Sequence, residues 1–215
     1  TRRSSDLLFL DEFPEFSRAA LETLRQPLEE REVTVSRVEA SVTYPANFQL
    51  VAAMNPCPCG HFPDRSRCRC TDGQITRYLQ KVSGPMLDRI DICVEASPIT
   101  YGDIRSSGNN ESSREIRARV EQARKIQRER FAGENIRCNG EMSGRHIRKF
   151  CWLGREEEKF MEEIFKKLAL SARMHDRILK VARTTADLAE EEKIRLADLC
   201  EAVSYVKSRD KFWGN

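Results

Sequence analysis

Two short apolar runs in this sequence each end at residues that can bind a metal ion or a phosphate group. Leu7–Leu10 is followed directly by Asp11 and Glu12, and Gln49–Met54 is followed by Asn55. Apolar runs without alternation are typical of parallel strands buried on both faces, and ligands bind beyond the carboxyl ends of such strands. An acidic residue there can hold Mg²⁺ through water while its neighbour deprotonates an attacking water, so the pattern indicates phosphate chemistry. The alternative is a buried strand that simply meets the acidic start of a helix.

Four of the eight cysteines are crowded into one loop, at positions Cys57, Cys59, Cys68 and Cys70. Two pairs of thiolates at this separation can surround one tetrahedral Zn²⁺, which would be structural rather than catalytic. The C-x-C spacing is less typical of zinc than C-x-x-C, so reduced thiols and disulfides stay open as alternatives. His61 is an outside candidate for a ligand.

Further strands and helices must position these residues. A helix is predicted over residues 17–30, kinked or shortened by Pro27, and alternation predicts a hairpin over residues 33–44. A second helix is predicted over residues 74–82, and Ile92–Ala96 is a candidate third strand.

The remainder of the chain carries no strand signal. Residues 101–113 are polar and are predicted to form a linker. Helical periodicity then predicts segments over residues 114–131, 143–152 and 155–170, a helix capped by Ser171 that runs to about residue 188, and a last helix near 196–206. We therefore expect an α/β part to about residue 97, followed by an all-helical part from about residue 113.

Five sequence motifs in order along the chain resemble those of the magnesium-chelatase-like AAA+ ATPases, and within them the ComM/YifB branch. The motifs are Leu7–Phe16, Leu24–Glu29, Val51–Gly60, Ser83–Asp91, and Ser171–Arg173 with Ile178–Thr184. The resemblance covers nearly the whole chain. It implies a partial parallel AAA+ sheet with helices in residues 1–97, a linker in residues 98–112, and an all-helical C-terminal lid in residues 113–215.

The same resemblance assigns roles to five residues and implies ATP and Mg²⁺ as cofactors. Asp11 would assist Mg²⁺ binding, and Glu12 would be the catalytic base of a Walker B element. Asn55 would be the sensor 1 residue, which helps to hold the attacking water. Arg89 would be an arginine finger that acts on the nucleotide of a neighbouring subunit, and Arg173 would be the sensor 2 arginine. The resemblance thus implies a ring oligomer, expected to be a hexamer.

The phosphate-binding P-loop motif G-x-x-x-x-G-K-[ST] is absent, because none of the ten glycines is followed by lysine. In related ATPases this loop precedes Walker B, so we expect the chain to be the C-terminal part of an ATPase module and to be inactive alone. In the related sheets, the P-loop strand lies between the sensor 1 strand and the third strand, so Ile92–Ala96 would lack its neighbour.

DNA is the expected substrate of the complete motor, in branch migration or related remodelling. The hairpin resembles the pre-sensor 1 insertion of ring ATPases, with Arg31 and Arg37 as candidate phosphate contacts. An ordinary solvent-exposed hairpin is the alternative. A chelatase-type motor that drives metal insertion into a tetrapyrrole and a non-enzymatic zinc-binding interaction module are the two other functions that remain open.

Composition sets broad limits. The 37 basic and 34 acidic residues leave a net charge of +3, too small to indicate nucleic-acid binding by itself. The uncharged stretch from Val42 to Pro63 contains four prolines and cannot be a membrane span. The first residues hold no apolar signal segment, so we expect a cytoplasmic protein.

Overall fold

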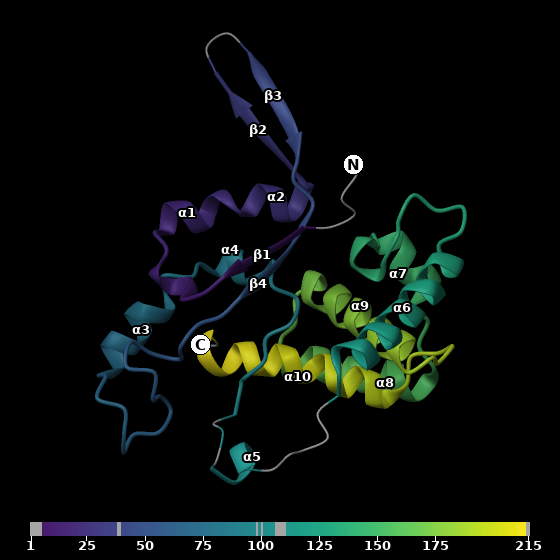
Figure 1. The fold of residues 1–215 in the computed structure, drawn as a ribbon. Coiled ribbons are helices and arrows are strands. Elements are labelled where there is room, and N and C mark those ends of the chain that lie inside the picture. Colours follow the sequence, from purple (N-terminus) through teal and green to yellow (C-terminus); the bar gives the residue numbers. More distant parts are fainter. Residues whose placement is uncertain (1–5, 38–39, 98, 100, 106–110, 214–215) are drawn as a thin grey trace. The chain divides into compact units, whose positions relative to one another are not determined.

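The computed structural model describes residues 6–37, 40–97, 99, 101–105 and 111–213 (Figure 1). The chain divides into two compact units. The first unit comprises Thr1–Asp91 with Phe212–Asn215, and the second comprises Ile92–Lys211. No helix within these described ranges has the length and apolarity that crossing a membrane requires.

The two apolar runs pair as parallel strands, which confirms that prediction. Strand β1 (Asp6–Leu10) lies beside β4 (Phe48–Ala52), with Leu10 opposite Ala52. Only one face of the pair is covered, where Leu10 and Leu50 pack into the core of the first unit. Leu7 and Phe9 on the other face are 65% and 56% exposed. The expectation of burial on both faces is therefore wrong for the described structure, in which this sheet has two strands.

The helix predicted over residues 17–30 is divided into α1 (Arg18–Thr23) and α2 (Arg25–Glu30). The division falls at Leu24, three residues before Pro27. Proline has no N–H to bond the carbonyl four residues earlier, but it is tolerated in a first turn, where N–H groups have no intrahelical partner. A short 3₁₀ helix, η1 (Phe13–Glu15), connects β1 to this region. Its Phe13 is buried with Leu21 of α1.

The predicted hairpin is confirmed as antiparallel strands β2 (Glu32–Ser36) and β3 (Ser41–Pro45), which project from the rest of the first unit (Figure 1). One face of the hairpin carries hydroxyl pairs, with 2.9 Å between Thr34 Oγ1 and Thr43 Oγ1. The opposite face is apolar, where Val35 lies opposite Val42, and both are exposed. Within the first unit, both faces of the hairpin are therefore exposed.

Helix α3 (Asp72–Leu79) confirms the helix predicted after the cysteine loop, and a capping box between Thr71 and Gln74 fixes its start. Helix α4 (Gly84–Leu87) follows. The candidate strand Ile92–Ala96 does not form in the structure. A strand needs a hydrogen-bonded neighbour, and among the described residues β1 and β4 pair only with each other. The predicted linker contains one short helix, α5 (Tyr101–Arg105).

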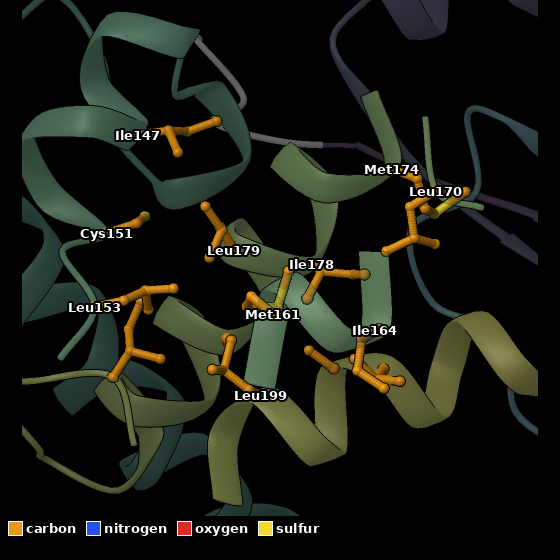
Figure 2. Packing of buried hydrophobic residues seen from close by; sticks show 14 of the residues in the cluster. Ile147, Cys151, Leu153, Met161, Ile164, Leu170, Met174, Ile178, Leu179 and Leu199 are labelled. Carbon is orange, nitrogen blue, oxygen red and sulfur yellow. The ribbon is translucent and has the colours of Figure 1, made fainter. Parts of the chain in front are cut away.

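The second unit is helical, as predicted. Its elements are α6 (Ser113–Arg130), η2 (Asn139–Glu141), α7 (Gly144–Phe150), α8 (Arg155–Lys167), α9 (Ala172–Leu188) and α10 (Leu196–Trp213), whose last two residues are assigned to the first unit. Figure 2 shows the apolar side chains of this core, among them Met161 and Ile164 of α8, Ile178 of α9 and Leu199 of α10. Helices α8, α9 and α10 each present one apolar stripe, and these stripes bury one another.

A buried charge network also stabilises the second unit. The Asp187 carboxylate is fully buried on α9 and accepts hydrogen bonds from Arg130 Nη1 at 2.8 Å, Arg183 Nε at 3.1 Å and Asn139 Nδ2 at 2.8 Å. Burial lowers the pKa of Arg183, and Asp187 opposes that shift. The network joins α6, η2 and α9 through one carboxylate.

Candidate functional site

The acidic pair Asp11 and Glu12 lies at the carboxyl end of β1, directly beside the end of β4. The Ala53 N–H donates to the Leu10 carbonyl at 2.9 Å, and the Phe13 N–H donates to the Ala53 carbonyl at 3.0 Å. These two bonds carry the strand pairing past the ends of both strands. Asp11, Glu12 and Asn55 are therefore held at one edge of the sheet, as the sequence predicts.

The backbone at the acidic pair is sharply turned. Glu12 adopts a left-handed conformation (φ 50°, ψ 44°), and its N–H donates to Asp11 Oδ1 at 2.9 Å. A non-glycine residue in this region carries a conformational cost and is common at functional sites. The turn leaves both carboxylates exposed, with no salt bridge to a cation in the described part of the chain. Both acids are thus free to take part in binding.

Asn55 has a close neighbour that the sequence analysis did not single out. Tyr78 of α3 is buried, and desolvation is the main cause that raises the pKa of its hydroxyl. The negative charges of Glu15, Cys57 and Glu12 raise that pKa as well, whereas the backbone amide of Asn55 opposes the shift. The Tyr78 hydroxyl therefore lies among the residues at the strand ends. The sequence signal for Tyr78 was only its place on the apolar stripe of a helix.

The four crowded cysteines converge on one point. Their sulfur atoms all lie within 4.8 Å of one another. Cys57 Sγ lies 3.4 Å from Cys59 Sγ and 3.8 Å from Cys68 Sγ, and the Cys59 and Cys68 sulfurs are 3.6 Å apart. Four thiolates around a tetrahedral metal with bonds of about 2.3 Å would be about 3.8 Å apart, whereas a disulfide needs about 2.05 Å. The cluster can therefore hold a metal ion, and its cysteines are free thiols here.

The backbone around the cluster favours thiolates at some of these positions. The N–H groups of His61 and Arg69 lower the pKa of Cys59 to about 6, and the Phe62 N–H donates to Cys57 Sγ at 3.4 Å. Desolvation and the neighbouring sulfurs act the other way, raising the pKa of Cys70 to about 12. Four uncompensated thiolates would repel one another, and a cation at their centre would remove that repulsion.

Arg89 is held by groups of the first unit. Its Nη1 donates to the Pro85 carbonyl at 2.7 Å, and its Nη2 pairs with the Glu29 carboxylate. The Arg89 side chain is only 12% exposed, whereas that of Glu29 is 52% exposed. Glu29 was not among the predicted site residues, although it belongs to the recognised motif Leu24–Glu29. The structure thus assigns Arg89 a partner about 60 residues away in sequence.

The other predicted arginines are Arg31, Arg37 and Arg173, and none of them is a sequence neighbour of the residues at the strand ends. Arg31 ends α2 in a left-handed conformation at the base of the hairpin, and Arg37 begins the turn at its tip, where its N–H donates to the Ala40 carbonyl at 2.8 Å. Both are exposed. Arg173 is exposed in the first turn of α9 in the second unit, after the N-cap Ser171.

The fold and the site together define a class. A parallel α/β core with carboxylates at a strand end, followed by a helical lid, is the AAA+ fold. Residues 1–104 match the family model described as magnesium chelatase, subunit ChlI, and residues 110–206 match the model of the C-terminal part of that subunit. The chain belongs to the magnesium-chelatase-like family, in the branch that includes ComM and YifB.

Several relatives match over almost the whole of this chain. Competence protein ComM of Haemophilus influenzae is 43% identical over 203 residues, which are 94% of this chain and 39% of the relative. The uncharacterized protein YifB of Escherichia coli is 44% identical over 201 residues, 93% of this chain and 38% of the relative. Rv2897c of Mycobacterium tuberculosis is 37% identical over 205 residues, 95% of this chain and 40% of the relative. The chain spans about two fifths of the length of these relatives.

Proposed function

We propose that the full-length protein is an ATP-hydrolysing ring motor, expected to be a hexamer, that acts on DNA in the cytoplasm. Residues 1–97 would form the C-terminal part of its ATPase core, residues 98–112 a linker, and residues 113–215 its lid. The observation that carries the proposal is the placement of Asp11, Glu12 and Asn55 at one edge of a parallel sheet. This is where open α/β sheets bind phosphate ligands.

Each residue at the sheet edge then has a distinct task. Asp11 would hold Mg²⁺ through water, and its exposed carboxylate fits that role because, within the described residues, only its Oδ1 is engaged, by the Glu12 N–H. Glu12 would accept the proton of the attacking water, and the Asn55 amide would hold that water in line. Mg²⁺ with ATP supplies the electrophilic phosphoryl group.

Two arginines would offset the negative charge on the phosphates. Arg89 would do so across a subunit interface, and its pairing with Glu29 supports the idea that its guanidinium is held in a defined position. Arg173 lies in the first turn of the 17-residue helix α9. The positive end of the helix dipole disfavours a cation there. An anionic ligand bound at that end would therefore be stabilised both by the helix dipole and by the Arg173 guanidinium.

Two basic features support DNA as the substrate. Five exposed cations of α6 lie within about 100° around the helix axis: Arg114, Arg117, Arg124, Lys125 and Arg128. Arg31 and Arg37 lie at the two ends of strand β2, about 20 Å apart in the extended chain. Both sets can contact backbone phosphates without reading the base sequence. The relative named as a competence protein is consistent with this substrate.

The substitution Glu12→Gln in the full-length protein tests the ATPase role. It removes the proton acceptor but keeps the size of the side chain, so kcat should fall about 10²- to 10⁴-fold while ATP binding changes little. Glu30→Gln is the matched control, since Glu30 is an exposed glutamate on α2 that bonds Gln26. Unchanged kcat in Glu12→Gln would remove Glu12 from the mechanism.

The family description favours one other function, a chelatase-type motor that drives metal insertion into a tetrapyrrole. DNA and a tetrapyrrole substrate can be distinguished by what stimulates ATP hydrolysis. We expect single-stranded or branched DNA to raise kcat, and the stimulation to weaken as salt rises, because phosphate contacts release counterions. Stimulation by a porphyrin and not by DNA would favour the chelatase motor.

We further propose that the metal of the cysteine cluster is Zn²⁺, bound by Cys57, Cys59, Cys68 and Cys70. The separations of the sulfurs and the four-thiol ligand set support it, since zinc prefers tetrahedral thiolate sites. Elemental analysis of protein purified under reducing conditions should find about one zinc per chain. Substoichiometric metal, with all four thiols freely titratable in the native protein, would contradict the proposal.

A further inference from the structure

The cysteine cluster is built on the same loop as Asn55. Cys57 follows Asn55 by two residues and is fully buried, while Cys59 follows by four. Two of the four metal ligands are therefore joined to Asn55 by very short lengths of backbone. Any constraint on those two sulfurs restricts the residue at the strand end.

The loop also turns back onto the Asn55 side chain. The Gly60 N–H donates to the Cys57 carbonyl at 3.0 Å, and Gly60 adopts a left-handed conformation (φ +79°). A Cβ atom at Gly60 would lie 3.8 Å from both Cγ and Oδ1 of Asn55, which is ordinary van der Waals contact. Gly60, which ends the turn that contains the first two cysteines, thus lies close to the side-chain amide of Asn55.

The opposite side of this loop lies against helix α3. Cys57 packs with Ile75, Tyr78 and Leu79, and Met54, which precedes Asn55, packs against the same cluster. The backbone amide of Asn55 lies beside the Tyr78 hydroxyl. Asn55 therefore has α3 and the Cys57–Gly60 turn as neighbours on two sides, and the residue is otherwise exposed.

We infer that the metal site is a positioning device for Asn55, so that a bound Zn²⁺ sets the efficiency of ATP hydrolysis without touching the nucleotide. The inference rests on the proposed ATPase function for its kinetic consequence. The restraint of Asn55 by the metal-bound loop follows from the contacts of that loop alone. Residues 56–70 contain no helix or strand to hold them, so a metal bound to four thiolates is the strongest restraint available to this loop.

The claim that the metal site restrains Asn55 is tested by hydrogen exchange at the backbone N–H of Asn55. The metal is removed in two ways: by a chelator, and by the double substitution Cys68→Ser/Cys70→Ser, which changes only ligands more than ten residues from Asn55. We expect exchange at Asn55 to accelerate at least about tenfold in both cases, because opening of the local structure governs exchange. Cys200→Ser, which alters an exposed thiol on α10, is the matched control and should leave exchange unchanged.

A conservative variant separates metal ligation from packing. Cys70→His retains a ligand set of three thiolates and one imidazole, which also binds Zn²⁺. It should keep zinc and keep the Asn55 amide protected, whereas Cys70→Ser should lose both. Co²⁺ substitution reports the same geometry through the visible absorption of tetrahedral cobalt. Protection of Asn55 that is independent of metal content would overturn the inference.

The kinetic part is tested in the full-length protein. Metal removal should lower kcat about 10- to 100-fold and leave the KM for ATP within about twofold, since outer residues that orient a catalytic group act at this scale. Added Zn²⁺ should restore kcat in the chelated wild type but not in Cys68→Ser/Cys70→Ser. An unchanged kcat, or a loss of ATP affinity instead, would overturn the positioning role. Absence of ATPase activity in the wild type would refute the proposed function, whereas the exchange result would still decide whether the metal site restrains Asn55.

Discussion

Replacing Asp187 by alanine should destabilise the second unit more than any surface substitution. Asp187 is fully buried and neutralises the guanidinium groups of Arg130 and Arg183, whose side chains are 14% and 3% exposed. In Asp187→Ala, Arg130 keeps a bond to Asn139 Oδ1 at 3.2 Å, and Arg183 keeps the carbonyl of Glu192 at 2.7 Å. Neither retained partner carries a charge.

The size of the stability loss in Asp187→Ala follows from the two largely buried guanidinium groups that would remain without their carboxylate. Breaking a buried ion pair by removing one partner costs about 3–5 kcal/mol, because a charge stays buried without compensation. The retained carbonyl contacts place Asp187→Ala near the lower end, at about 3–4 kcal/mol. For a unit of this size the melting temperature should fall by roughly 10–20 °C.

Thermal and urea unfolding followed by far-ultraviolet circular dichroism would measure this loss. Asp176→Ala is the matched control on the same helix, because Asp176 is 44% exposed and its partner is the neighbouring His175. The control should change stability by less than about 1 kcal/mol. The effect of Asp187→Ala should persist in high salt, since buried charges are poorly screened. A loss no larger than that of the control would refute the role of Asp187 as the centre of the network.

Three further outcomes are expected. Arg89→Ala subunits and Glu12→Gln subunits of the full-length protein should each be inactive alone but should regain ATPase activity when mixed, because finger and base at one interface come from different chains; no recovery under subunit exchange would contradict the trans role. Burial raises the pKa of the Cys151 thiol to about 12, so at pH 8 it stays protonated and should resist iodoacetamide while exposed Cys200 reacts, as mass spectrometry of the labelled peptides would show. The 215-residue chain by itself, which holds no P-loop motif, should show no measurable ATP turnover in a phosphate-release assay at millimolar ATP.

The secondary structure of this chain is largely readable from local patterns. The apolar runs before Asp11 and Asn55 form β1 and β4, and Ser171 caps α9 by accepting the Met174 N–H at 3.2 Å. These features depend on residues a few positions apart, whose periodicity and hydrogen-bonding groups are visible in the sequence. The same local reasoning was wrong for Ile92–Ala96, which has the composition of a strand but no paired neighbour among the described residues.

In the candidate site, too, some features follow from the local sequence and others from tertiary packing. The sequence by itself determined which residues follow the strands, the spacing of the four cysteines and the motifs that identify the family. Only the tertiary structure decided that the four sulfurs converge, that Glu29 holds Arg89 from 60 residues away, and that the Tyr78 hydroxyl lies beside Asn55. Such partners are chosen by how separate elements pack, and periodicity reports only that a face is buried, without naming what buries it.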